Sequence, residues 1–403
     1  MTEDLLMKKL MVLGAPDFQI PLLKQARNMG VHTYVLDMNP HSRGAVYADD
    51  FYQCSLKDSK SVLDIARKIM PDGVTVGMCD VAVNSAAIVS KELGLPGLDV
   101  DTAQKATDKY LMIQEFEKFH VPHPWFKRMR IEDISALIND QHISYPFISK
   151  PIDMAGSRGI NKIESRNDIE SMLNDSIKAS DNHEIIIEEF MEGPEVSVEL
   201  LVLGHTPHVF QITDKYTSGA PHFVELGHTQ PSSLPNSIKR AIEDVAQQAV
   251  RALGLFDCCA HAEIIVTKEG PKMVEIGARM GGDSIQQQLI MLSKGINMPY
   301  YSIKMALGEE VTLPNINQDL ASTIRFLTCK KSGTVKNVCN VNEARRLDHI
   351  RQVEVYCQKG DAVAFPVDSS GRLGYVLSQA DSTEESIAAC EMAVDMIKIL
   401  VED

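Results

Sequence analysis

The chain has 403 residues, which is more than one hydrophobic core usually serves, so we expect several domains. Its net charge of -15 disfavours a nucleic-acid or membrane surface, which would need clustered lysine and arginine. No apolar stretch approaches the roughly 20 residues of a membrane span, and the acidic start is unlike a targeting peptide. We therefore expect a cytoplasmic protein whose partners are small molecules, with no nucleic acid and no membrane among them.

The first 105 residues predict a small α/β domain. Apolar strands at residues 10–13 and 31–36 enclose a segment with helical spacing, and strand and helix continue to alternate after it. This alternation predicts a parallel sheet with right-handed crossovers. The first turn begins at Gly14 and lacks the glycine fingerprint of dinucleotide-binding domains, and Pro16 removes a backbone donor there. We therefore do not expect NAD binding.

From residue 106 the pattern becomes α+β. Long strands of alternating character are separated by a predicted helix over residues 232–254. A third strand-rich set follows, and residues 382–402 predict a closing helix with Ser382 and Glu385 in capping-box spacing. We divide the chain into residues 1–105, 106–192, 193–312 and 313–403, the last being a small strand-rich α+β domain.

Two glutamates on either side of a predicted hairpin are candidate metal ligands. A three-residue loop at 268–270 would place Glu263 opposite Glu275, with Ile265 and Met273 on the same face. Carboxylates whose Cβ atoms lie about 5 Å apart repel each other unless a cation, a shared proton or water separates them. Oxygen ligands at this spacing suit Mg²⁺, especially Mg²⁺ that also binds phosphate. The alternative is a solvent-exposed sheet face, on which glutamates are common.

The stretch ISKPIDMAGSRGI, residues 148–160, is a candidate phosphate-binding flap. Lys150 ends an apolar strand, and Gly156 and Gly159 would let backbone amides approach an anion closely. Ser157 and Arg158 add a hydroxyl and a charged donor. The stretch lacks the G-K-[ST] run of a P-loop, and taken alone it is better explained as a plain hairpin turn.

An acidic connector, IIIEEFMEGPE at residues 185–195, follows the next strand. Its backbone could hold a purine, and Glu195 could accept hydrogen bonds from ribose hydroxyls. Taken alone, an acidic turn between strands explains it better. Lys109, in the helix before the flap, is by itself an ordinary solvated lysine.

The order of these pieces resembles the ATP-grasp superfamily over about residues 109–290: lysine helix, strand with Lys-Pro, glycine flap, acidic connector and glutamate hairpin. The resemblance implies an α/β N-terminal domain (1–105), a small lobe with the flap (106–192), a large lobe with the metal-binding hairpin (193–312) and the C-terminal domain. It implies that the ATP phosphates contact two lysines and a closing flap: Lys109, Lys150, Ala155, Gly156, Ser157, Arg158 and Gly159. It implies that adenine and ribose lie against Glu188, Phe190, Met191 and Glu195.

The same resemblance implies that Glu263 and Glu275 hold Mg²⁺, which Mn²⁺ could replace, and that Arg279 joins Lys150 as a catalytic residue against the transferred phosphoryl group. There is one departure. Many members have Asn two residues after the second glutamate, and this chain has Gly277, which puts full two-metal coordination in doubt.

The substrate residues are harder to read. The loop at 213–235 offers His222 and His228, which could contact a carboxylate or relay a proton, or could be ordinary loop histidines. Further candidates are the amides of a predicted helix N-terminus and an anion clamp on a strand: Gly282, Asp283, Ser284 and Arg325.

The run after Glu275 and the C-terminal domain look most like amino-acid ligase branches. We therefore predict an ATP-dependent carboxylate–amine ligase that forms an amide through an acyl-phosphate, acts on an amino acid or small carboxylate, and assembles as a homodimer. One alternative is an ATP-grasp ligase of nucleotide biosynthesis, either one that acts on bicarbonate and resembles carbamoyl phosphate synthase or one that acts on a phosphoribosylamine. For a phosphoribosyl group we see no clear basic cluster. Another is a non-catalytic ATP-binding regulatory protein.

Overall fold

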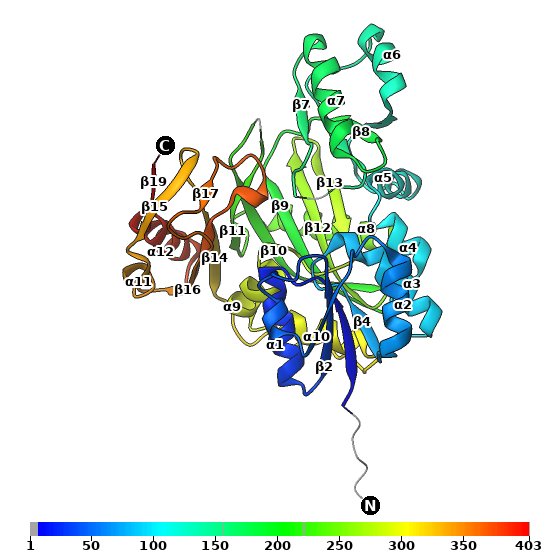
Figure 1. The fold of residues 1–403 in the computed structure, drawn as a ribbon. Helices are drawn as coiled ribbons and strands as arrows, with labels where there is room; N and C mark the ends of the chain where they lie inside the picture. The colour runs from blue at the N-terminus through cyan, green and yellow to red at the C-terminus, as the bar shows by residue number, and fades with distance from the viewer. Residues whose placement is uncertain (1–6, 155, 221, 403) are drawn as a thin grey trace, which may run out of the picture.

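The computed structural model describes residues 7–154, 156–220 and 222–402, which form three lobes around one large sheet (Figure 1). The N-terminal lobe is a parallel sheet in the order β3-β2-β1-β4, which confirms the predicted α/β class. Its strands are β1 (Lys9–Leu13), β2 (His32–Asp37), β3 (Asp50–Gln53) and β4 (Gly73–Thr75). Its helices are α1 (Ile20–Asn28), α2 (Ser59–Ile69), α3 (Val83–Leu93) and α4 (Val100–Lys105). Parallel strands covered by helices on both faces are apolar throughout, as the buried Leu10–Leu13 stretch shows.

The small lobe is a four-stranded antiparallel sheet in the order β5-β8-β6-β7. Its strands are β5 (Phe126–Met129), β6 (Phe147–Pro151), β7 (Asn161–Ile163) and β8 (Ile185–Glu189). Its helices are α6 (Ile134–Asn139) and α7 (Ile169–Ala179), and α5 (Lys109–Lys118) leads into it. The glycine flap lies in the connection from β6 to β7, which is an edge strand of this sheet.

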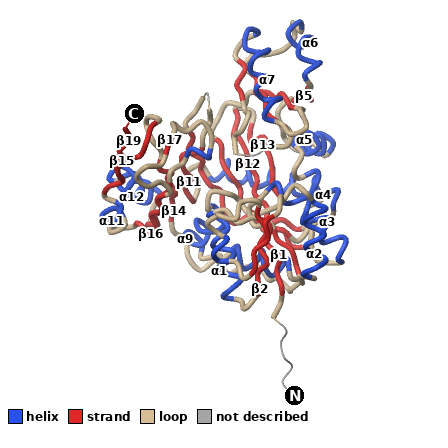
Figure 2. The backbone as a smooth tube through the Cα atoms, viewed as in Figure 1, coloured by secondary structure: helices blue, strands red, loops and turns tan. Residues whose placement is uncertain are grey.

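The large sheet has eight strands in the order β13-β12-β9-β10-β11-β14-β18-β16, and Figure 2 shows them between helices on either side. Five come from the middle of the chain: β9 (Glu195–Leu203), β10 (Thr206–Thr217), β11 (Glu225–Gln230), β12 (Cys258–Thr267) and β13 (Gly270–Gly277). Three follow later: β14 (Ala321–Leu327), β16 (Ile350–Val355) and β18 (Gly374–Ala380). The C-terminal strands therefore continue the sheet that begins before residue 312.

The two faces of the large sheet differ in character. Helix α8 (Asn236–Leu253) packs on one face, where Val198, Leu200 and Ala260 are buried with it. Near the end of β9 and the start of β12, the opposite face meets the N-terminal lobe and α10 (Met298–Ala306), with Leu201 and Cys259 in that contact. Successive residues of a strand alternate between the two faces of a sheet. Beyond this contact, the apolar residues of these strands point to α8, and over the rest of the second face the alternate positions carry charged side chains.

The C-terminal part ends differently from the prediction. Helix α12 (Thr383–Met396) begins as predicted, with the Ser382 hydroxyl accepting from the Glu385 amide at 3.2 Å. The last residues form β19 (Lys398–Glu402), which pairs with β15 (Gly333–Cys339) in a small sheet that also holds β17 (Ala362–Val363). The alternating apolar residues Ile399 and Val401 suit a strand with one covered face.

The remaining helices are the short α9 (Ile290–Lys294), which continues a π-helical turn (Ile285–Leu289), and α11 (Val341–Ala344). In the part of the chain that the structure describes, no helix has the length and apolar character to cross a membrane.

Candidate active site

The β12–β13 hairpin places Glu263 directly opposite Glu275, as predicted. The predicted loop is wrong, however. Thr267 pairs with Gly270, so the turn has two residues, and a β-bulge between Glu263 and Ile264 restores the expected pairing. The bulge also moves Met273 to the buried face beside α8, away from the two glutamates.

Each of the two facing carboxylates is held by a lysine. Lys109 Nζ lies 3.0 Å from Glu275 Oε2 and donates to the Met154 carbonyl at 2.7 Å. Lys109 is the first residue of α5, whose N-terminus is capped by the Asp108 side chain. Burial lowers the pKa of Lys109, but the Glu275 carboxylate outweighs it and the net shift is upward.

Lys215 is the site residue that the sequence reasoning missed. Its ammonium on β10 lies 2.6 Å from Glu195, 3.1 Å from Glu225 and 2.9 Å from Glu263, and its side chain is only 4% exposed. Burial lowers its pKa, but the three carboxylates raise it well above the usual value. The only local signal is a lysine in an otherwise half-apolar strand.

Glu195 is thus held beside the hairpin by Lys215. Its predicted role as a ribose ligand stays a prediction. Burial raises the pKa of the Glu195 carboxyl even though Lys215 lowers it.

On the small lobe, Lys150 Nζ lies 2.7 Å from Glu188 Oε2, and both side chains are buried. They lie on adjacent strands, β6 and β8. The predicted phosphate lysine and the predicted adenine residue therefore neutralise each other in this state. Phe190 stacks under the Lys162 ammonium at 4.3 Å, and Met191 is buried beside it in the connector after β8.

The flap turns through left-handed backbone. Gly156, Ser157 and Gly159 have φ of 71°, 60° and 73°. A Cβ at Gly159 would lie 2.6 Å from the Ala179 side chain, whereas Gly156 faces open space. Arg158 takes part in a contact of this flap region, and Ala155 lies outside the described residues.

Arg279 is hydrogen-bonded by a residue of the N-terminal lobe. Its Nε and Nη2 donate to the two oxygens of Asp80 at 2.7 and 2.6 Å. Asp80 follows β4 at the carboxyl end of the parallel sheet, 199 positions before Arg279. Such a bidentate pair fixes the plane of the guanidinium. Two N–H groups of Arg279 are thereby committed to a partner that the sequence reasoning missed.

A second charged group lies farther along the polar face. Asp283 accepts a bidentate pair from Arg372 at 2.6 and 2.8 Å, and His228 Nε2 lies 3.1 Å from it. Burial raises the pKa of Asp283, but Arg372 and His228 outweigh it and hold the pKa well below its ordinary value. Arg372 belongs to the C-terminal part of the chain and was also missed.

The other predicted substrate residues fare differently. Arg325 pairs with Gly227, one register position from His228, and so points to the opposite face, where it stacks on Tyr216 at 5.4 Å. The structure therefore does not bring Arg325 to the site, which corrects that prediction. His222 lies in the partly exposed β10–β11 loop, and its substrate role stays a prediction. Gly282 and Ser284 lead into a π-helical turn, and the role of their amides is likewise untested.

Behind Glu263 lies a buried polar network. His261 Nδ1 is 2.9 and 3.0 Å from the two oxygens of Glu199, and Gln286 donates to the same carboxylate at 2.8 Å. His261 Nε2 lies 3.5 Å from Glu263 Oε1. Burial lowers the pKa of His261, but the Glu199 carboxylate raises it to about 10.

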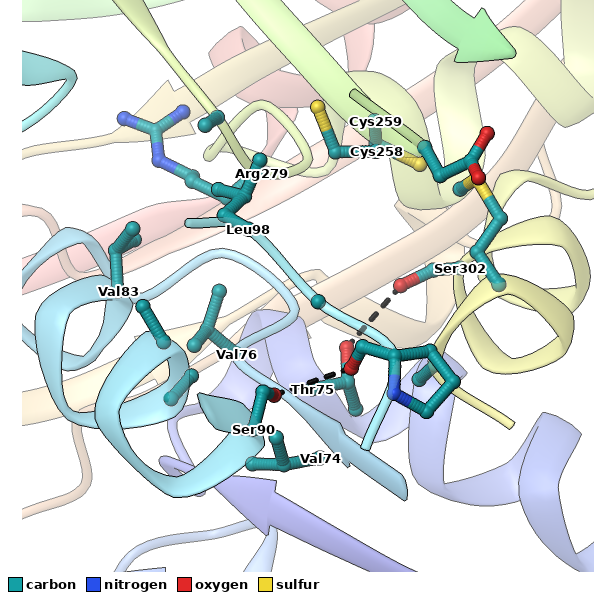
Figure 3. Close-up of a pocket in the computed structure, with 18 of the residues that line it drawn as sticks. Val74, Thr75, Val76, Val83, Ser90, Leu98, Cys258, Cys259, Arg279 and Ser302 are labelled. Carbon is teal, nitrogen blue, oxygen red and sulfur yellow. Dashed lines mark hydrogen bonds between the residues drawn. The ribbon is translucent and has the colours of Figure 1, made fainter. Parts of the chain in front are cut away.

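Two cavities adjoin this site. One of about 240 Å³ opens between the N-terminal lobe, the flap strand and the hairpin, and its charged lining comprises Lys57, Asp80, Lys109, Asp153, Asp181 and Glu275. A smaller one of about 90 Å³ lies at the back of Arg279, between Val74–Val76 and α10 (Figure 3). Its walls are mainly apolar, and the Thr75 and Ser302 hydroxyls bond across it at 3.2 Å.

Comparison with known proteins agrees with this geometry. Residues 143–287 match the model of the ATP-grasp domain, and residues 325–402 match L-amino acid ligase C-terminal domain 2. The chain is 25% identical to an uncharacterized protein of Sinorhizobium fredii and 28% identical to alanine–anticapsin ligase of Bacillus subtilis. These alignments cover 77% and 55% of this chain but only 64% and 51% of the two relatives.

A solved structure of L-amino acid ligase from Bacillus licheniformis superposes with a TM-score of 0.86 at 23% identity, covering 98% of this chain and 99% of that one. At this identity the likeness establishes the fold. The chain therefore carries an ATP-grasp domain, and a C-terminal domain of the type found in L-amino acid ligases follows it.

Proposed function

We propose that the chain is an ATP-dependent carboxylate–amine ligase that forms an amide through an acyl-phosphate and releases ADP and phosphate. One observation carries this proposal: the facing carboxylates of Glu263 and Glu275 are each paired with a lysine, and Arg279 follows Glu275 on the same segment. The match to an ATP-grasp domain supports the same conclusion.

The donor set fits a divalent cation. Glu263 and Glu275 offer carboxylate oxygens, which Mg²⁺ prefers, and cationic side chains now neutralise both. Gly277 offers no side chain, so these two residues would hold the metal. When bound, Mg²⁺ would neutralise charge on the ATP phosphates and orient them.

The remaining cations suit phosphoryl transfer. Lys109 on α5 and Lys150 on β6 are each now paired with a carboxylate that an ATP phosphate could replace. Arg279 keeps Nη hydrogens beyond those that Asp80 takes, so its fork can still meet a phosphoryl oxygen. In the proposed step a carboxylate oxygen of the substrate attacks the γ-phosphorus of ATP, and the bond to the ADP oxygen breaks.

The cavity of about 240 Å³ favours an amino acid as the carboxylate substrate. It touches Glu275, and three of its four carboxylates already have cationic partners: Arg279 for Asp80, Lys57 for Asp181 and Lys109 for Glu275. Asp153 keeps a buried oxygen without a hydrogen-bond partner, which suits an ammonium group, and among the described lining residues each lysine is already paired with a carboxylate, which leaves no spare cation for the phosphate of a phosphoribosyl substrate. This observation disfavours the alternative of a nucleotide-biosynthesis ligase with a phosphoribosyl substrate.

The amine then displaces phosphate from the acyl carbon, and its proton must leave. Asp283 and His228 stand on the polar face next to Glu225, with their charge balanced by Arg372. We propose that this group borders the amine substrate and that the flap keeps water from the acyl-phosphate.

The test is ADP release from Mg·ATP with pools of amino acids and small carboxylates, for wild type and Glu275→Ala. The proposal expects release that needs both a carboxylate and an amine and that falls at least about a thousandfold in the variant. Release of AMP would mean adenylation instead of phosphorylation. Tight ATP binding without turnover in any pool would favour the regulatory alternative.

A further inference from the structure

A buried chain of polar groups runs from the interior of the large sheet to the hairpin. Glu199 is fully buried, and its two oxygens are used by His261 Nδ1 and by the Gln286 amide. Gln286 also donates to the Ala260 carbonyl at 2.7 Å, which fixes its own orientation. The Glu199 carboxylate is thus rigidly placed on one side of the His261 ring.

The other side of that ring meets a proposed metal ligand. His261 and Glu263 are two residues apart on β12 and lie on the same face, and Nε2 lies 3.5 Å from Glu263 Oε1. The second Glu263 oxygen faces Lys215. Gly281 lies so close to the ring that a Cβ there would be 2.6 Å from His261 Nδ1. The ring can therefore neither flip nor withdraw easily.

Glu199 and His261 lie buried against each other inside the sheet. Replacing such a buried polar pair by packed apolar residues is often neutral or stabilising, so stability alone does not account for it. Carboxylates that bind metals are commonly oriented by hydrogen bonds from neighbouring groups, and losing such a group lowers the metal affinity.

We propose that Glu199 and His261 are positioning residues that hold the Glu263 carboxylate in the orientation that binds the divalent cation. The pair acts through His261 Nε2 and does not touch substrate. This inference rests on the proposed function, in which Glu263 is a metal ligand.

Two variants at one position separate the roles of the two ring nitrogens. The amide nitrogen of His261→Gln reaches the place of Nε2 and can still donate to Glu263. The amide of His261→Asn reaches the place of Nδ1, keeps the bond to Glu199 and leaves Glu263 unsupported. Both remove the ring, so they are matched for lost packing, and the Tm of each reports folding.

The probe is Mn²⁺ in the presence of ADP, with free Mn²⁺ followed by electron paramagnetic resonance, a measurement that needs neither catalysis nor an amino acid. We expect Mn²⁺ affinity to fall about 10- to 100-fold in His261→Asn and clearly less in His261→Gln, which loses the bond to Glu199 but keeps a donor for Glu263. If His261→Asn does not fold, Glu199→Gln replaces it, with an expected loss of about tenfold.

Equal affinities in wild type and both variants would overturn the inference and leave the proposed function intact. Equal losses in Asn and Gln would also overturn it, because the ring would then serve packing only. A wild-type protein that binds no Mn²⁺ with ADP would overturn the proposed function and the inference together.

Discussion

Replacing Lys215 should lower the stability of the fold more than any other change considered below. Its ammonium is surrounded by Glu195, Glu225 and Glu263, all within 3.1 Å, in a nearly solvent-free position. In Lys215→Met the side chain keeps its approximate length, but the three carboxylates lose the positive charge that lies between them. Removing one partner of a buried pair costs about 3–5 kcal/mol, because the other partner stays desolvated. At about 2–4 °C per kcal/mol, the Tm of the metal-free protein should fall by roughly 6–20 °C.

The pH dependence provides the sharper signature. Without the ammonium, repulsion raises the pKa values of the three carboxyls above their ordinary value of about 4.3. A group with a raised folded-state pKa stabilises the fold at low pH and loses that contribution as pH rises. The stability deficit of Lys215→Met should therefore be larger at pH 8 than at pH 5.

The assay is thermal unfolding of metal-free wild type and variant at both pH values. Lys272→Met is the matched control, because its ammonium joins Glu189 and Glu269 at 3.2 and 2.8 Å near the surface, where a pair contributes about 0–1 kcal/mol. A Lys215→Met protein with a Tm within 2–3 °C of the control, roughly the effect of 1 kcal/mol, would refute the reasoning.

Three further predictions follow from single contacts. Asp80→Asn takes the charged bidentate partner from the Arg279 guanidinium, so kcat/KM of the ligase reaction should fall about 10- to 100-fold. Unchanged kinetics would contradict this. Gly159→Ala should lower the free energy of unfolding by about 1–3 kcal/mol, because φ at this position is 73° and the new Cβ would lie 2.6 Å from Ala179. Gly156→Ala is the control: its φ is 71°, but its Cβ would face open space, so it should cost less. Equal losses in chemical unfolding would count against this packing account. Because the pKa of Asp283 is lowered in the folded protein, its carboxylate stabilises the fold above about pH 4, and this contribution is lost as the pH falls further. The free energy of unfolding should therefore decline less steeply with acid in Asp283→Asn than in wild type. Equal declines in the two proteins would argue against a stabilising Asp283–Arg372 pair.

The sequence could predict what short-range periodicity encodes. The facing of Glu263 and Glu275 follows from strand alternation, and the α/β lobe follows from alternating strands and helices. Even there the turn was misassigned, because a bulge is an irregularity of backbone twist that side-chain patterns hardly mark. The closing strand β19 was predicted as helix because its alternating residues continue a helical run.

The missed site residues share a physical reason. Asp80, Lys215 and Arg372 each meet a partner on another strand or another lobe, and Asp80 and Arg372 lie 199 and 89 positions from theirs. No local pattern sets such contacts, since they depend on how whole lobes pack. The misplacement of Arg325 is the opposite case: its strand was right, but the register put its side chain on the far face.

The central claim is that the substrate carboxylate is phosphorylated by ATP before the amine attacks. The most direct measurement is transfer of ¹⁸O. An amino acid pair that supports ADP release is supplied, with both oxygens of the acyl-donating carboxylate labelled, and the released phosphate is analysed by mass spectrometry. The account predicts one ¹⁸O atom in each phosphate, because the acyl-phosphate gives up a carboxylate oxygen when the amine displaces phosphate. Unlabelled phosphate, or label in AMP, would contradict it.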